Sequence, residues 1–408
     1  MKDGVALLRR NKDFRRLYFA SLISNGGDWF ALIPLLALLH ELTGSGLYGG
    51  LVLAADTAVF ALFSPYAGTV ADRFDRKRLL AAAEATCAVF ALLLLLVGDG
   101  TAWLSVLAIG AIAAAKAFAT PSISAAIPNL VAPADLATAT VMNAVAWGSM
   151  LAVGAALGGL LTALVGTTAC FLLDAGSFLV SALLIWSCRT PFQQPREVGL
   201  EHPRFRAAIK AAVTYARSDH AVLALLAAKP GIAFANGSLV LFPLLAADVF
   251  GVGSSGLGLM YAARGLGVLA GPLVLGRRGR EEPALWSVLA LGTFACGILY
   301  VAVALSPWFW LVLLLIAMAH VGGGSNWTVT TYGLQRRVPD AVRGRIASAD
   351  AMAVTLAIAV NQALAGVLSD VVAPRTLVAC FGGASVVYAV GWYAATRNLR
   401  RVPSTAGA

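Results

Sequence analysis

The chain has 408 residues, of which 59% are apolar and only 12% are charged. An average soluble domain carries about 25% charged residues. A water-soluble protein is therefore excluded, because so few polar groups cannot cover its surface. The net charge of +10 would suggest nucleic acid as the partner of a soluble protein, but no such partner is expected for a chain dissolved in lipid.

Twelve stretches are long and apolar enough to cross a bilayer, which takes about 20 residues of helix. Six lie at 17–41, 47–70, 79–98, 102–127, 137–165 and 167–188. Six more lie at 221–247, 254–276, 284–305, 307–332, 346–369 and 375–396. The sequence predicts an all-α polytopic membrane protein with six-helix halves at 1–188 and 220–408. The polar, proline-containing stretch 189–219 is the predicted cytoplasmic linker, and its basic part, 204–217, is expected to form a surface helix.

Basic residues gather on one side of this topology. With the N-terminus inside, 26 of the 30 Lys and Arg residues fall in inner segments, and one, Arg375, falls in an outer loop. Lys and Arg accumulate in the cytoplasmic loops of membrane proteins. We therefore expect a multi-pass protein of the cell membrane with both termini in the cytoplasm.

The two halves share a pattern of charge and glycine. Asp56 lies twelve residues before Gly68 in the second span, and Arg264 lies twelve residues before Gly276 in the eighth. Repeated halves around a midplane site are the usual plan of a secondary transporter. The sequence therefore predicts two pseudo-repeats around a central cavity, with Asp56 and Arg264 as buried charges at matched positions.

The loop after the second span carries the most specific motif, which reads G-T-V-A-D-R-F-D-R-K-R from residue 68. Its Gly68, Asp72, Arg73 and Arg76 resemble the signature loop of the major facilitator superfamily. Asp75 departs from that signature, which usually has glycine there, and leaves the geometry of the turn open. The resemblance implies that the other four residues form a gating latch between the halves, and that spans one, four, seven and ten line the cavity.

Two further stretches support a particular branch of this family. The segment P-D-A-V-R-G-R at 339–345, and Asp174 with Ser177 and Phe178, are similar to the branch of enterobactin-exporter-like and macrolide-efflux-like proteins. Residues 154–159 resemble the family's antiporter motif, but Ala155 stands where that motif has proline. Since small residues four apart are typical of close helix packing, we favour packing as the reason for this stretch.

Asp28 is the strongest functional candidate, because a charge inside a span costs about 2.5–3.5 kcal/mol on insertion scales. At about 1.5 Å per residue, it lies about 16 Å into the first span, near the midplane. With Ser21, Ser24 and Asn25 it forms a polar stripe on one helix face. The stripe favours a water-filled cavity with Asp28 as the proton-coupling residue. A structural aspartate satisfied by a neighbouring helix is the alternative.

Polar residues also mark the other spans that would line a cavity. Lys116 and Thr120 lie one turn apart in the fourth span, and Lys229 and Asn236 give the seventh span a weaker stripe. Pro230 frees backbone groups there, which cavity water could hydrate.

The tenth span offers His320 and Trp327 as cavity residues. His320 is a candidate proton relay, because histidine titrates near neutral pH. A buried histidine in a packing role is the interpretation that we favour.

Acids and bases are balanced inside the predicted spans, with Asp28, Asp56 and Asp174 against Lys116, Lys229 and Arg264. This balance predicts ion pairing in at least one conformation, because unpaired charges are costly in an apolar interior. Asp174 is expected only to hold the sixth span in place. Glu84 and Asp350 are expected to lie near the inner surface, where their side chains reach water.

These features predict a proton-coupled exporter of small amphipathic molecules, of drug or siderophore type, that works by alternating access. Proton-coupled uptake of a polar or anionic metabolite, bound by the three buried bases, is the alternative. A membrane enzyme or a passive pore is a more remote possibility, since four scattered histidines form no catalytic constellation. ATP drive is not expected, because the sequence has no GxxxxGK[ST] phosphate loop.

No cofactor or metal is indicated by the sequence. The five cysteines lie in or beside apolar stretches without ligand spacing and are interpreted as buried hydrophobic residues. The expected partners are a small-molecule substrate, protons and the lipid bilayer, and the protein is expected to be a monomer.

Overall fold

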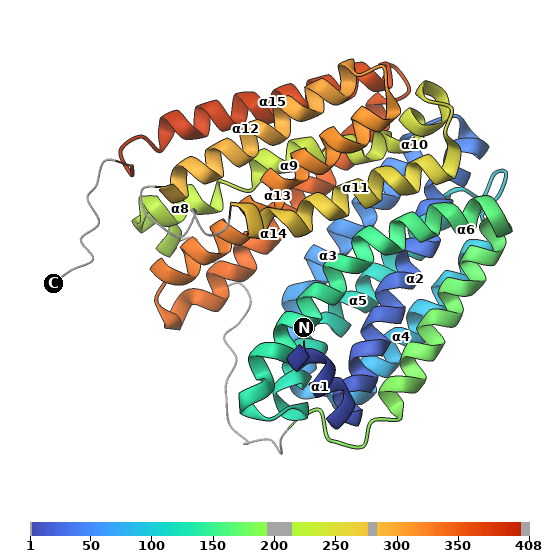
Figure 1. Cartoon of the computed structure of the whole chain (residues 1–408), viewed down its shortest axis with the longest axis vertical. Coiled ribbons are helices and arrows are strands. Elements are labelled where there is room, and N and C mark those ends of the chain that lie inside the picture. Colours follow the sequence, from blue (N-terminus) through green and yellow to red (C-terminus); the bar gives the residue numbers. More distant parts are fainter. Residues whose placement is uncertain (1, 194–213, 276–283, 401–408) are drawn as a thin grey trace. The chain divides into compact units, whose positions relative to one another are not determined.

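The computed structural model describes residues 2–193, 214–275 and 284–400. Every regular element within these ranges is a helix (Figure 1). Eleven helical runs are long and apolar enough to span a membrane. One of them contains two predicted spans, so all twelve spans expected from the sequence are present.

Contacts divide the chain into two compact units. Unit 1 comprises Met1–Gly44, Ala55–His202 and Val252–Ala262, and unit 2 comprises Ser45–Ala54, Pro203–Gly251 and Ala263–Ala408. Each unit contains most of one half of the sequence and a short segment from the other half. The predicted linker and surface helix fall largely on residues 194–213, which lie outside the described ranges, as does Gly276.

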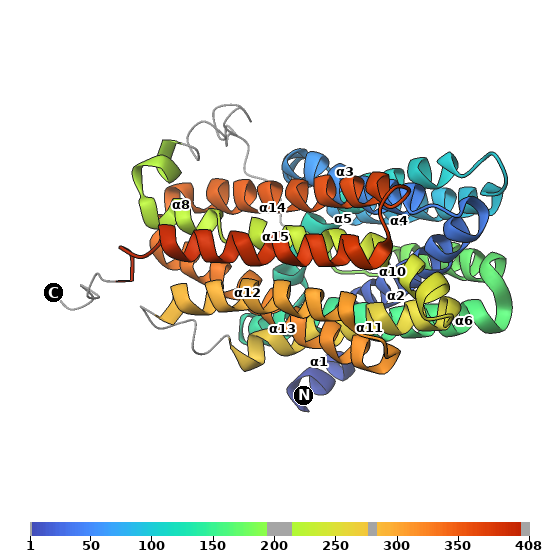
Figure 2. The same cartoon turned by 90° about the horizontal axis from the view of Figure 1, so that it is seen from above.

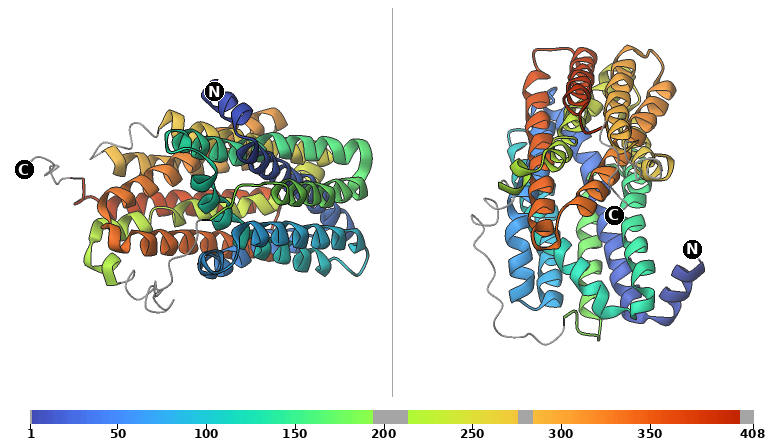
Figure 3. Two further views of the ribbon diagram at one scale, coloured as in Figure 1. Left: turned by 90° about the horizontal axis from the view of Figure 1, so that it is seen from below. Right: turned by 90° about the vertical axis from the view of Figure 1, so that its left-hand side faces the viewer.

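The helices of unit 1 run mostly alongside one another (Figures 1 and 3). They are α1 (Lys2–Arg10), α2 (Lys12–Thr43), α3 (Leu47–Arg73), α4 (Arg76–Leu93), α5 (Trp103–Leu130) and α6 (Leu136–Trp186). The first residues of α3 belong to unit 2. Helix α2 packs against α6, and α4 packs against both α5 and α6.

Helix α6 combines the predicted fifth and sixth spans. Its 51 residues would extend about 75 Å, whereas the apolar core of a bilayer is about 30 Å thick. Gly166 interrupts the helix with φ 80° and ψ 169°, a conformation that glycine adopts readily because it has no Cβ. The chain reverses there (Figure 1), at the residue that separates the predicted spans 137–165 and 167–188.

Unit 2 contains the remaining spans. Its helices are α8 (His220–Leu226), α9 (Pro230–Gly237), α10 (Phe242–Leu244), α11 (Gly253–Val274), α12 (Ala284–Leu305), α13 (Phe309–Arg337), α14 (Asp340–Leu368) and α15 (Pro374–Ala395). The first residues of α11 belong to unit 1. Helix α12 packs against α13 and α15, and α9 packs against α14 and α15 (Figure 2).

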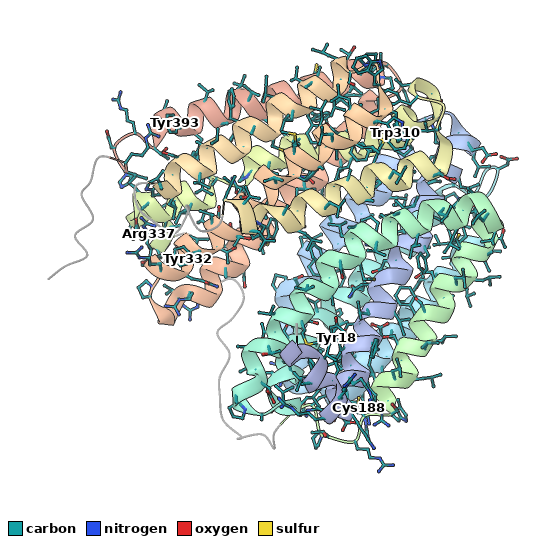
Figure 4. The ribbon with its side chains drawn as sticks, viewed as in Figure 1. Tyr18, Cys188, Trp310, Tyr332, Arg337 and Tyr393 are labelled. Carbon is teal, nitrogen blue, oxygen red and sulfur yellow. The ribbon has the colours of Figure 1, made fainter. Side chains whose placement is uncertain are left out.

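Residues typical of a membrane interface mark the two ends of α13. Trp310 lies near its start, and Tyr332 and Arg337 lie near its end (Figure 4). Aromatic and basic residues are enriched at the two boundaries of membrane-spanning helices. The Arg337 guanidinium stacks 5.3 Å from the ring centroid of Trp286 on α12, which fixes this end of α13 to its neighbour.

The seventh span is broken at Pro230, which begins α9 and has no backbone N–H to donate. Side chains of α15 bond the nearby carbonyls. The Tyr388 hydroxyl donates to the carbonyl of Ala227 at 2.6 Å, and the Trp392 indole donates to that of Ala224 at 2.9 Å. We expected cavity water to hydrate the backbone here, but at these two carbonyls a neighbouring helix supplies the donors.

Candidate functional site

The centre of unit 1 holds an ion pair between two predicted site residues. The ammonium of Lys116 on α5 donates to Oδ2 of Asp28, which lies midway along α2. The side chains of Lys116 and Asp28 are 21% and 32% exposed, so the pair is only partly covered by protein although it lies midway along its helices. The ring of Phe178 on α6 lies 5.1 Å from the ammonium. The structure thus brings together an acid and a base that the sequence assigned to separate spans.

The residues of the polar stripe predicted on α2 make separate contacts. Ser24 is buried and donates its hydroxyl to Oε1 of Glu84 on α4 at 3.2 Å. The Asn25 amide donates to the carbonyl of Ser21, one turn earlier, at 2.7 Å. Of the four residues, Asp28 is therefore the one that bonds Lys116, while Ser24 belongs to a buried contact with α4.

The stripe predicted on α5 is exposed along its length. Thr120 and Ser124 are exposed, whereas Ala117 and Ala119 between Lys116 and Thr120 are buried. The Thr120 hydroxyl donates to the carbonyl of Lys116 at 2.9 Å. The exposed hydroxyls therefore continue the accessible face that begins at the ion pair.

Asp56 on α3 was expected to be a buried charge, which is wrong, because its residue is exposed. It lies within electrostatic range of both Asp28 and Lys116. Its carboxylate therefore adds negative charge beside the ion pair, and any change in the protonation of one aspartate alters the field at the other.

Two further acids in unit 1, Glu84 and Asp174, are buried. Glu84 was expected to reach water near the inner surface, but it is 5% exposed. Asp174 was expected only to hold the sixth span, but it is 1% exposed and lies within electrostatic range of Asp28, Lys116 and Glu84. For Glu84, hydropathy gives the depth in the span but not the helix face, so no signal in the sequence separated it from a solvated acid.

Unit 2 holds a second ion pair, between Lys229 and Asp350. Lys229 precedes α9 as its N-cap residue, and Asp350 lies on α14. The Lys229 ammonium also lies 4.5 Å from the ring centroid of Trp327 on α13. Asp350 was expected to extend toward water, which is wrong, because it is 5% exposed. The charge of Lys229 is therefore neutralised within unit 2. The ring of Trp327 is 47% exposed and can contact a ligand.

The other site residues predicted in unit 2 lie mostly in its interior. The ring Nε2 of His320 is hydrogen-bonded to the hydroxyl of Tyr300 at 2.9 Å, and His320 is 3% exposed. Arg264 on α11 lies within electrostatic range of this histidine. Asn236 is buried and donates to the carbonyl of Ile232 at 3.0 Å. These contacts agree with a packing role for His320.

The motif loop forms the start of α4. The Asp75 carboxylate accepts a hydrogen bond from the N–H of Arg78 at 2.8 Å and thereby caps the helix. Its backbone is extended, with φ −63° and ψ 116°, so the turn does not need the glycine that the signature usually has. The departure from the signature is therefore explained by helix capping.

The four residues of the predicted latch lie in or beside this loop. Arg76 donates from Nη1 to the carbonyl of Ala125 on α5 at 3.1 Å, and Arg73 is the exposed last residue of α3. Beyond the helical backbone, Gly68 and Asp72 lie outside the described part of the structure. The latch therefore stays a prediction.

The glycine-rich stretch on α6 is a close-packing surface. A Cβ on Gly154 would lie 3.0 Å from the Trp29 ring on α2, and one on Gly159 would lie 2.9 Å from Cα of Gly258 on α11. Such distances leave no room for a side chain, which agrees with the packing interpretation. Among the described residues, no group of three or more His, Cys, Asp or Glu could hold a metal ion.

Comparisons with known proteins identify the family. The model of the Major Facilitator Superfamily matches residues 18–361. The uncharacterized MFS-type transporter YceJ of Bacillus subtilis (strain 168) is 28% identical over 86% of this chain and 88% of its own length. Enterobactin exporter EntS of Escherichia coli O1:K1 / APEC is 28% identical over 98% of this chain and 96% of its own. Macrolide efflux protein A of Streptococcus pyogenes is 22% identical over 81% and 83%.

The fold agrees with these relatives. A bacterial homolog of the human lysosomal transporter Spinster, in an inward-facing and unoccupied conformation, superposes with a TM-score of 0.73 at 14% identity. The match covers 96% of this chain and 98% of that structure. Because the family model spans most of the sequence and the helical fold is shared, this chain belongs to the major facilitator superfamily, whose members are membrane transporters.

Proposed function

We propose that this secondary transporter exports small amphipathic molecules from the cytoplasm in exchange for protons. The observation that carries the proposal is the Asp28–Lys116 ion pair, a partly exposed acid and base in the middle of a membrane-spanning bundle. An intramembrane charge is costly to maintain and usually marks a transport or proton pathway. Protonation of Asp28 releases Lys116 and changes the charge beside the substrate path, and this change biases the equilibrium between two conformations.

The direction of transport is proposed from the relatives. Two of them are named for export, one of enterobactin and one of macrolides. An amphipathic substrate also suits the exposed face of unit 1, because the hydroxyls of Thr120 and Ser124 adjoin the partly exposed ion pair. In unit 2, the half-exposed ring of Trp327 offers an apolar surface.

Uptake of an anionic metabolite has less support. That reading assigned anion binding to Lys116, Lys229 and Arg264, yet both lysines are paired with aspartates within their own units. Lys229 is also 3% exposed, so its ammonium is not available to a dissolved anion. The structural likeness to transporters of other substrates indicates the fold alone.

We further propose a monomer in the cell membrane with both termini in the cytoplasm. The distribution of Lys and Arg supports this orientation. Single cysteines placed after Met1 and near residue 400, in a background without the native cysteines, should react with an impermeant maleimide only after the cells are opened. Labelling of intact cells would contradict the orientation.

Transport in vesicles of both orientations tests the main proposal. Inverted membrane vesicles should accumulate a fluorescent amphipathic dye or a macrolide when their lumen is made acidic, and the accumulation should collapse when the proton gradient is dissipated. Asp28→Asn should abolish the accumulation. Asp99→Asn, the same substitution at an exposed loop position, is the matched control and should leave it unchanged. Accumulation by Asp28→Asn equal to that of the unmodified protein would refute the role of Asp28.

A further inference from the structure

Asp174 occupies a buried polar seam between α2 and α6. Its carboxyl group lies directly against Gly27, where an added Cβ would be 2.7 Å from Oδ1. Gly27 is the residue before Asp28, so the absence of a side chain there allows Asp174 to approach the helix that carries the ion pair. Asp174 itself is 1% exposed, so it is buried, whereas the Asp28–Lys116 pair is partly exposed.

The Asp174 carboxyl group lacks the hydrogen bonds that a buried carboxylate requires. Its Oδ1 has no hydrogen-bond partner among the residues that the structure describes. The adjacent Ser177 hydroxyl donates to the backbone carbonyl of Asp174 at 2.8 Å. An ionised carboxylate that is buried without compensating donors is very costly, and such groups bind a proton instead.

The charges around Asp174 also indicate that its carboxyl group binds a proton. Several titratable groups lie within electrostatic range of Asp174, namely Asp28 on α2, Glu84 and Cys87 on α4, and Lys116 on α5. The Cys87 thiol is occupied by a contact to the carbonyl of Ile112 at 3.9 Å. One ammonium therefore faces three buried or half-buried carboxyl groups, those of Asp28, Glu84 and Asp174, and it bonds Asp28.

The Lys116 ammonium bonds Asp28 and lies beside the helix that carries Asp174. Its ammonium lies against the ring of Phe178, which follows Asp174 by one turn of α6 and so shares its helix face. The flexible four-carbon stem of lysine permits a change of partner without movement of a helix. Once Asp28 is neutral, Asp174 is a carboxyl group within electrostatic range of Lys116 that has an oxygen free to accept its hydrogen bond.

We propose that Asp174 and Asp28 exchange a proton through competition for Lys116. While Lys116 bonds the ionised Asp28, Asp174 is a neutral carboxylic acid. When Asp28 takes up a proton, Lys116 moves to Asp174, whose O–H bond breaks, and the proton leaves along the seam. One proton enters and one leaves, Lys116 stays charged, and the net charge of the site is unchanged. This inference rests on the proposed function and adds a second carboxyl group to its proton path.

Infrared difference spectroscopy on the purified full chain tests the exchange without substrate. The band to follow is the C=O stretch of protonated carboxyl groups, at neutral pH and in a Glu84→Gln background, which removes the third acid. Asp174→Asn should remove the signal of one carboxyl group per protein. Asp28→Asn should remove the same signal, because Lys116 then ionises Asp174. Lys116→Met should instead add one carboxyl group, since Asp28 loses its partner.

A fixed structural role for Asp174 gives different spectra. A signal unchanged by Asp174→Asn would overturn the proposal, as would a signal lost in Asp174→Asn but kept in Asp28→Asn. Asp99→Asn is the control and should change nothing. If Glu84→Gln prevents folding, the same two aspartate variants in the unmodified chain should each lower the signal by one carboxyl group. The measurement uses no gradient and no substrate. A negative result therefore contradicts the proton exchange between Asp174 and Asp28 without contradicting proton-coupled export.

Discussion

Lys229 and Asp350 form an ion pair whose side chains are only 4% and 7% exposed. The pair joins the break before α9 to the first half of α14, and Trp327 on α13 covers the ammonium. Oδ1 of Asp350 has no hydrogen-bond partner among the described residues. In unit 1, by contrast, the side chains of the Asp28–Lys116 pair are partly exposed. We therefore assign a structural role to the pair in unit 2 and the coupling role to the pair in unit 1.

Breaking the pair in unit 2 should destabilise the protein. Lys229→Met leaves Asp350 buried without a counter-ion, and removal of one partner of a buried pair costs about 3–5 kcal/mol. Thermal unfolding in detergent should therefore show a clearly lower midpoint. The double variant Lys229→Met/Asp350→Leu should recover most of the loss, because neither charge remains. A double variant less stable than the single variant would contradict this account.

The close approach of Gly159 to Gly258 should not tolerate a methyl group. A Cβ at Gly159 would lie 2.6 Å from the carbonyl oxygen of Ser254, which is backbone and cannot turn away. Gly159→Ala should lower the unfolding midpoint and reduce transport. Gly110→Ala is the matched control, because its nearest atom would lie at an ordinary 3.7 Å. Equal behaviour of the two variants would show that the contact at Gly159 is unimportant.

The cap at Asp75 makes a prediction about the motif loop. Loss of an N-cap side chain costs about 0.5–2 kcal/mol, so Asp75→Ala should lower stability by about 1 kcal/mol. Asp75→Asn keeps an acceptor and should be nearly neutral. Asp75→Gly, which restores the residue usual in the signature, should cost less than alanine. The free energy of unfolding of the three variants is compared by chemical unfolding in one detergent. If Asp75→Ala were the most stable of the three, a capping role would be excluded.

Cys188 follows the end of α6 (Figure 4) and should react slowly with thiol reagents. Burial, together with the nearby charge of Asp13, raises the pKa of this thiol to about 11, while the charges of Arg16 and Lys77 oppose the shift. Only the thiolate is nucleophilic. The reactive fraction therefore grows as the pH rises toward 11. In a variant with Cys188 as its sole cysteine, maleimide labelling at pH 7 should be far slower than that of free cysteine and should accelerate with pH. Rapid labelling independent of pH would be inconsistent with a buried thiol.

The number and order of the spans could be predicted from the sequence, because a bilayer demands about 20 apolar residues per crossing. Even the boundary inside α6 was predicted within a residue, since Gly166 ends one apolar stretch and starts the next. The charge balance also predicted pairing. That balance named no partners, and the pairing of Asp28 with Lys116 comes from the structure.

The buried partners of these residues could not be predicted. Asp350 and Glu84 both lie near span ends in the sequence, and a long side chain at such a depth can reach water. Whether it does so depends on the neighbouring helices, here α9 and α13 around Asp350 and α2 around Glu84. Those contacts join residues more than 50 positions apart in the sequence. The side chain of Asp72 in the motif lies outside the described residues, so its place in the latch stays a prediction.

Counterflow separates substrate movement from proton coupling and tests the central claim most directly. Proteoliposomes loaded with unlabelled macrolide or dye exchange it for the labelled compound without net proton movement. Asp28→Asn should retain this exchange at close to the rate of the unmodified protein, yet lose accumulation driven by a pH gradient. Loss of exchange together with accumulation would mean that Asp28 is needed for substrate binding or folding. Accumulation that survives in Asp28→Asn would contradict the assignment of proton coupling to the Asp28–Lys116 pair.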